Sequence, residues 1–161
     1  MKIRFVLGLL FSLLLFSCSS DDGDSGSNSI VGTWDLVALE LDGATAEEEA
    51  AEQLVSLLAT QGCYLVTLRF RDNGTAEFES SLSYLDYSGL LTGGLGIDCP
   101  TESDSESATY TYENGELAIT DSEGMTNSAA VSLSGDRLSF DLEGSEFDEI
   151  EGSGSLIFER R

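Results

Sequence analysis

Apolar residues recur at every second position through most of the chain after residue 30, which is the spacing of strands that bury one face. This alternation predicts eight strands, at about residues 31–41, 64–71, 76–84, 108–112, 117–119, 129–133, 138–142 and 156–160. In the first of them, Trp34, Leu36 and Ala38 share the apolar face. The pattern therefore predicts an all-β domain with the single tryptophan in its core.

Residues 45–62 follow a different pattern, that of an amphipathic helix. Thr45 and Glu48 have the types and spacing of a capping box, in which each side chain bonds to the backbone N–H of the other residue. The apolar stripe that follows consists of Ala46, Ala50, Leu54, Leu57 and Leu58. Gly62 is suited to ending the helix. We therefore expect a helix over residues 46–61, between the first two strands.

Short connections between the predicted strands fix their register. Asn114-Gly115 and Gly135-Asp136 are two-residue turns that keep the apolar faces together. After the second strand we expect a three-residue loop with Gly74 in the left-handed conformation. That loop pairs Phe70 with Ala76, whereas a two-residue turn would bring an acid onto the core face.

Short and long connections alternate, so an up-and-down order gives the domain two different ends. The short turns lie at the end of Trp34. The helix lies at the other end with the three long connections, residues 86–106, 121–128 and 143–151. We expect an eight-stranded antiparallel up-and-down barrel; a β-sandwich filled by its own side chains is the main alternative. Arg160 ends the last strand beside Trp34, where its guanidinium can cover the indole ring.

The residues at this end resemble those of the lipocalin family. Gly32-Thr33-Trp34 matches the Gly-x-Trp motif of the family's first strand, and Arg160 matches the Arg that its last strand packs across that Trp. The second lipocalin signature is absent, no helix follows the last strand, and the helix at 46–61 stands where lipocalins have a lid loop. The chain is most similar to the lipocalin-like lipoprotein group. The resemblance implies a barrel over residues 30–161, closed by Gly32, Trp34 and Arg160, that binds a small apolar ligand.

Residues 1–17 have the organisation of an export signal. Lys2 and Arg4 precede an apolar run over residues 5–16, which is shorter than the about 20 residues of a membrane-spanning helix. Leu15-Phe16-Ser17-Cys18 resembles the lipobox of bacterial lipoproteins, with the bulky Phe16 as a departure, and this implies that Cys18 is acylated. An ordinary signal peptide is the alternative.

Residues 18–29 are polar and acidic, which predicts a flexible linker. An acidic run directly after the lipidated Cys resembles the surface-export signals of some gram-negative outer-membrane lipoproteins. We therefore expect a lipid anchor in the outer membrane, with the cell surface favoured over the periplasmic face.

The charge of the chain limits its partners. Of 161 residues, 30 are acidic and 7 basic, and removal of residues 1–17 leaves five basic residues and a net charge of about −25. Such a field disfavours nucleic acid and anionic membrane surfaces. We also expect the protein to be a monomer.

The chemistry of the chain is also limited, because it has no histidine and its only lysine is Lys2. With Cys18 used by the lipid, Cys63 and Cys99 remain as a pair in an exported protein, and the predicted topology brings both to the helix end. We expect a disulfide between them. The usual acid–base and nucleophile sets cannot be assembled, so we expect no enzyme, no metal site and no cofactor.

Inward positions near the helix end define a candidate ligand site. Its predicted lining is Leu36, Ala38, Tyr64, Val66, Leu82, Tyr84, Tyr110, Val131 and Phe140. The segments around the mouth, residues 42–62, 86–106, 121–128 and 143–151, contain acids but no Lys or Arg. We therefore expect a neutral or cationic apolar ligand, under a lid made by Leu54, Leu57 and Leu58. The alternative is a barrel filled by its own side chains, whose acidic loops contact a partner protein.

Overall fold

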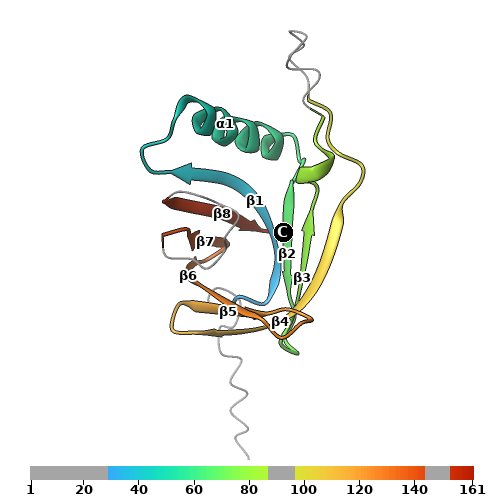
Figure 1. The fold of residues 1–161 in the computed structure, drawn as a ribbon, viewed down its shortest axis with the longest axis vertical. Coiled ribbons are helices and arrows are strands. Elements are labelled where there is room, and N and C mark those ends of the chain that lie inside the picture. The colour runs from blue at the N-terminus through green and yellow to red at the C-terminus, as the bar shows by residue number, and fades with distance from the viewer. Residues whose placement is uncertain (1–28, 87–96, 144–152) are drawn as a thin grey trace, which may run out of the picture.

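A computed structural model describes residues 29–86, 97–143 and 153–161. The predicted export signal, Cys18 and nearly all of the linker lie outside the described residues, as do parts of two acidic mouth segments. Eight strands form a closed antiparallel barrel in the order β1 to β8 (Figure 1). The strands are β1 (Gly32–Leu41), β2 (Val66–Phe70), β3 (Thr75–Ser80), β4 (Asp104–Glu113), β5 (Glu116–Thr120), β6 (Thr126–Ser134), β7 (Arg137–Asp141) and β8 (Gly154–Arg160). The predicted barrel is confirmed.

The tight turns have the predicted geometry. Gly74 has a φ of 78°, and Phe70 pairs with Ala76 across the three-residue loop. Asn114 and Gly115 both have positive φ, 54° and 83°, as the two-residue Asn-Gly turn of a β-hairpin requires. β4 and β6 begin several residues earlier than the alternation indicated, because their first residues are polar on both faces.

β1 contains an irregularity that the alternation could not show. The register with β8 shifts between Leu36 and Ala38, so Leu36 pairs with Phe158 but Ala38 pairs with Ile157. An extra residue in one strand moves every later side chain to the other face. Ala38 therefore lies on the outer face, and its predicted place in the ligand lining is wrong.

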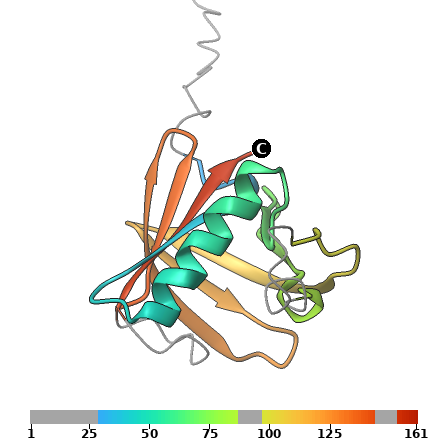
Figure 2. The same ribbon diagram turned by 90° about the horizontal axis from the view of Figure 1, so that it is seen from above.

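After the bulge β1 curves away from β2, with which it pairs only from Gly32 to Asp35 (Figure 1). Helix α1 (Ala46–Thr60) lies along the second half of β1, as both views show (Figures 1 and 2). The Leu41 N–H donates to Glu52 Oε1 at 2.6 Å, which satisfies a backbone group that would otherwise need a strand partner.

α1 begins as predicted but buries a different face. The Thr45 and Glu48 capping box is present, and the helix ends one residue before the predicted position. Leu58 is 1% exposed, whereas Leu57 is 47% exposed and Ala46 and Ala50 are exposed. The predicted lid role of Leu57 is therefore wrong. No helix among the described residues is long and apolar enough to cross a membrane.

The buried side chains form two groups. The larger group lies inside the barrel and includes Trp34, Leu117 and Leu138, each with no exposed surface. The smaller group lies between α1 and the start of β2 and consists of Leu58, Cys63, Leu65 and Leu85. The helix is therefore held on the barrel by a core of its own.

Candidate functional site

One end of the barrel is sealed by Trp34 and Arg160. The Arg160 Cζ atom lies 4.2 Å from the centroid of the Trp34 ring. Its Nη1 and Nη2 atoms donate to the carbonyls of Val31 and Ser29, both at 2.7 Å, and its Nε lies 3.3 Å from Asp136 Oδ1. Arg160 thus joins the end of β8 to the segment that precedes β1, and the predicted contact with Trp34 is present.

Gly32 leaves the space that this seal needs. Its φ of 150° is one that side-chain-bearing residues rarely adopt, and a Cβ there would lie 2.5 Å from Arg160 Nη1. The Arg160 guanidinium could move away from such a Cβ only by losing its hydrogen bonds to the carbonyls of Val31 and Ser29. We will call this end, with Gly32, Trp34 and Arg160, the closed end.

A buried carboxylate lies on the outer face beside the closed end. Asp35 accepts from Arg161 Nε at 2.8 Å, from Arg161 Nη2 at 2.6 Å and from Thr67 Oγ1 at 2.7 Å. The hydrogen bond to Asp35 raises the pKa of Arg161 above its ordinary value. The Arg161 Cζ lies 5.6 Å from the centroid of the Tyr64 ring. Tyr64 precedes β2 and lies beside this outer cluster, so its predicted place in the interior lining is wrong.

The opposite end, where β1 and β2 diverge and β4 begins, we will call the open end. Inside the barrel, Leu36, Val131 and Phe140 are buried, and Val66 and Tyr110 are half-buried. The Tyr110 hydroxyl donates to the Arg71 carbonyl at 2.9 Å, and its burial raises the pKa of the phenol. These five predicted lining residues all pack in or against the barrel core.

Leu82 and Tyr84 do not line the interior. β3 ends at Ser80, and Leu82–Tyr84 forms a short 3₁₀ turn in which the Tyr84 N–H donates to the Ser81 carbonyl. A helical turn ends the alternation, which leaves Leu82 47% exposed and Tyr84 39% exposed. The Tyr84 hydroxyl donates to Asp104 Oδ1 at 2.9 Å, and this bond raises the pKa of the phenol.

Three apolar side chains at the open end were missing from the predicted lining. Phe78 and Leu156 are half-buried on the inward face of β3 and β8, and Val55 of α1 packs against the same core. The alternation did place Phe78 and Leu156 inward. The sequence pattern did not indicate Val55, because this residue lies off the predicted apolar stripe of the helix.

The mouth of the barrel is acidic. On β4, Asp104 pairs with Ser80 and Glu106 pairs with Phe78, so both carboxylates lie on the inward face but are exposed. No ion pair holds Glu106 within the described ranges. A further carboxylate, that of Glu52 on α1, lies at the end of β1, where it accepts from the Leu41 N–H.

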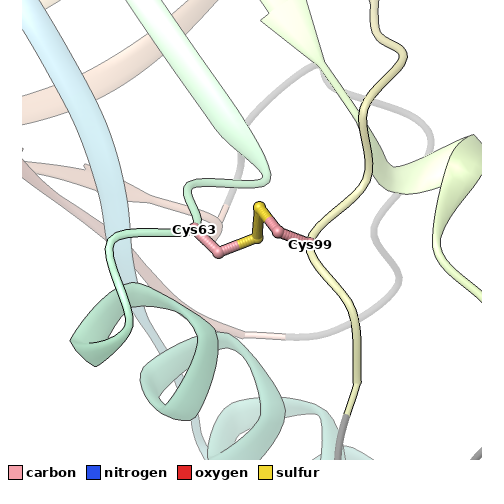
Figure 3. The surroundings of a disulfide bond; sticks show 2 residues. All are labelled: Cys63 and Cys99. Carbon is pink, nitrogen blue, oxygen red and sulfur yellow. A yellow bond between two sulfur atoms is a disulfide. The ribbon is translucent and has the colours of Figure 1, made fainter.

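The predicted disulfide is confirmed. Cys63 and Cys99 are bonded, with their Cα atoms 5.6 Å apart (Figure 3). The bond joins the residue that follows the α1 turn to the segment that leads into β4. Among the residues that the structure describes, no three acid, Cys or His side chains come together in a way that could hold a metal ion.

A barrel with one sealed end and apolar side chains directed to the other is the architecture of small-molecule binding barrels of the lipocalin type. The family model of the lipocalin-like domain matches residues 30–140. The chain belongs to the lipocalin-like domain family. This fold suggests a binding protein for small hydrophobic molecules, and the family is generally non-enzymatic.

Among solved structures, a lipocalin-like protein from Bacteroides uniformis ATCC 8492 is similar at 16% sequence identity and a TM-score of 0.45. The match covers 81% of this chain and 97% of that chain. No curated protein matches the chain.

Proposed function

We propose that the protein is a lipid-anchored, non-enzymatic binding protein that holds a small apolar, neutral or cationic ligand at the open end of its barrel. The observation that carries this proposal is the set of inward apolar side chains that the barrel leaves only half-buried at that end. They are Val55, Val66, Phe78 and Leu156. A ligand that covered them would remove apolar surface from water, at about 25 cal/mol per Å².

The ligand is small because eight strands enclose little space. Such a barrel holds either one small molecule or its own side chains. The closed end is already filled, since Trp34 and Leu117 have no exposed surface. The ligand therefore occupies only the open end of the barrel, beside Phe78 and under α1.

The charge of the ligand follows from the mouth. Asp104 and Glu106 lie on the inward face of β4, and an entering carboxylate would approach both without a basic partner. A cation would gain from the same field. Fatty acids and other anions are therefore excluded.

The proposed anchor fits this orientation. The linker from Cys18 would reach the barrel at Ser29 and Ile30, which lie at the closed end, where Ser29 bonds to Arg160 and Ile30 is buried. A tether at that end leaves the mouth directed away from the membrane surface. We propose the outer membrane as the location, with the cell surface favoured.

Fluorescent ligands of matched size and different charge would test the proposed site. We expect the neutral and cationic members to bind and the anionic member to bind weakly. Glu106→Gln should weaken the cationic member and leave the neutral one unchanged. Glu116→Gln, which changes an exposed acid on the outer face of β5, is the matched control and should alter neither. Tight binding of the anion would contradict the proposal.

A second candidate function rests on the surface beside α1. Leu57, Leu82 and Tyr84 are large, exposed and at the helix end of the domain. If none of the ligands binds, the better explanation is a filled barrel that contacts a partner protein through this surface and the acidic loops around it.

A further inference from the structure

A groove of about 350 Å³ runs over β3, β4 and β5 and is lined mainly by residues of the outward phase. Its floor is the middle of β4, with Ser107 and Thr109, and its walls come from the β2–β3 loop and from the end of β5. The lining residues are Arg71, Thr75, Ala76, Ser107, Ala108, Thr109, Thr120, Asp121 and Ser122. Most of these side chains end in a hydroxyl group. The volume is at the lower end of the range for small-molecule sites.

The sheet register arranges the threonines in a row. Thr75 pairs with Thr109, Thr109 with Thr120, and Thr120 with Thr126, so one Thr from each of four neighbouring strands lies on the same outer line. Neighbouring strands are about 4.8 Å apart, which sets the spacing of these side chains. Each hydroxyl offers one donor and two acceptor positions. Thr75 Oγ1 already donates to Asn73 Oδ1 at 2.7 Å, Thr109 Oγ1 donates to the Thr120 carbonyl at 3.5 Å, and the Thr120 and Thr126 hydroxyls share a hydrogen bond of 2.7 Å. The row is thus a regular array of acceptor positions.

The walls of the groove are held in place before any ligand arrives. The Arg71 N–H donates to the Thr75 carbonyl at 2.9 Å, and the Tyr110 hydroxyl holds the Arg71 carbonyl from inside the barrel. On the other side, the Asp121 N–H donates to the Met125 carbonyl at 3.0 Å. A preformed site loses little conformational entropy on binding.

The two charged groups of the groove are already used by their neighbours. Arg71 Nη2 lies 2.8 Å from Glu77 Oε2, and Asp121 Oδ1 accepts from the N–H groups of Glu123 and Met125. They are also opposite in sign, so the groove favours neither anions nor cations. An apolar ligand would cover the acceptor positions that the hydroxyls of the groove keep open to water, which costs free energy.

We propose that this groove binds a neutral polyhydroxylated ligand, a short carbohydrate, over β4. The sugar hydroxyls would donate to the Thr109 and Thr120 hydroxyls and exchange hydrogen bonds with Ser107, in place of water. Because each exchange with water has a small net effect and the lining has no aromatic ring for stacking, the affinity is expected to be millimolar.

The test uses NMR of the isotope-labelled full chain in detergent micelles, titrated with maltose and lactose. Glucuronate and cyclohexanol serve as the anionic and apolar comparisons. At least one neutral sugar should shift the backbone signals of Ser107, Thr109 and Thr120, and the two comparison compounds should not. Shifts at Phe78 and Leu156 instead, or none from either sugar, would overturn the proposal.

Thr109→Val is the diagnostic variant, because valine keeps the shape and strand preference of threonine but removes the hydroxyl. It should weaken sugar binding by about five- to tenfold. Thr111→Val is the matched control, on the same strand and the same exposed face but outside the groove, and should bind as the parent does. Ser107→Ala gives a second measurement if the Thr109 variant folds poorly. Equal affinity in the parent and in the groove variants would also overturn the proposal.

Discussion

At the closed end, Arg160 combines a ring contact with two hydrogen bonds to backbone carbonyls. We expect Arg160→Ala to lower the free energy of unfolding by about 0.5 to 2 kcal/mol. The Trp34 ring has no exposed surface in the parent protein. In the variant, water should reach the ring and move its fluorescence to longer wavelength. Denaturant unfolding followed by that fluorescence measures both effects.

Arg137→Ala is the control for this prediction. Arg137 also forms an ion pair, with Glu40, but the two side chains are 52% and 61% exposed. Exposed pairs contribute about 0 to 1 kcal/mol. If both variants left stability and fluorescence unchanged, the seal at Trp34 would have no energetic role.

Thr67 is the uncharged partner of the buried Asp35 carboxylate. Its hydroxyl donates to Asp35, whose side chain is only 5% exposed. Thr67→Val should cost about 1.5 to 3 kcal/mol, the range for a lost hydrogen bond to a charged group. Thermal or denaturant unfolding of this variant beside Thr111→Val gives the comparison. Similar stability of the two variants would mean that water replaces the lost donor.

The two residue pairs differ in how far the sequence reveals them. Trp34 and Arg160 share the inward face of strands that become neighbours when the barrel closes, so the alternation predicts their contact. Asp35 lies on the outward face, where an acid is normally solvated. Its burial depends on Arg161 and Thr67, which come from other parts of the chain, and no local pattern indicates that.

At the scale of elements, the disulfide connects α1 to the start of β4. It closes a loop with a sequence separation of 36. Replacing Cys63 and Cys99 together by serine should lower the free energy of unfolding by about 3 to 4 kcal/mol, because the unfolded chain loses a constraint. Denaturant midpoints of the oxidised parent and the double variant test this. Equal midpoints would show that the bond does not stabilise the fold.

The elements also show where prediction from sequence stops. Strand number, order and turn types followed from the period of two and from the glycines, which act locally. No local signal of this kind indicated the bulge after Leu36, because Val37, Ala38 and Leu39 are all apolar and fit either face. The buried face of α1 includes only Leu54 and Leu58 of the predicted stripe, because Glu52 bonds to the Leu41 backbone and Val55 packs against the barrel core. Tertiary contacts of this kind override an amphipathic pattern.

At the scale of the whole molecule, the lipid anchor remains a prediction from Leu15-Phe16-Ser17-Cys18. Metabolic labelling with a fatty acid should mark the protein, and Cys18→Ala should abolish the label. Cys63→Ser, which leaves Cys18 in place, should remain labelled. Labelling of the Cys18 variant would contradict the anchor. Protease treatment of intact cells would then separate the cell surface from the periplasmic face.

The divergence of β1 from β2 has a consequence for self-association. Beyond Asp35, one side of β1 is protected by α1 and Glu52 rather than by a strand. Any movement of α1 that admitted a ligand would also uncover an unpaired strand edge, which can add a strand from a second copy. The net charge of −23 opposes such an encounter. If the proposed ligand enters past α1, its exchange and the exposure of this edge are coupled, and salt, which screens the repulsion, should favour dimers in which the β1 edge is uncovered.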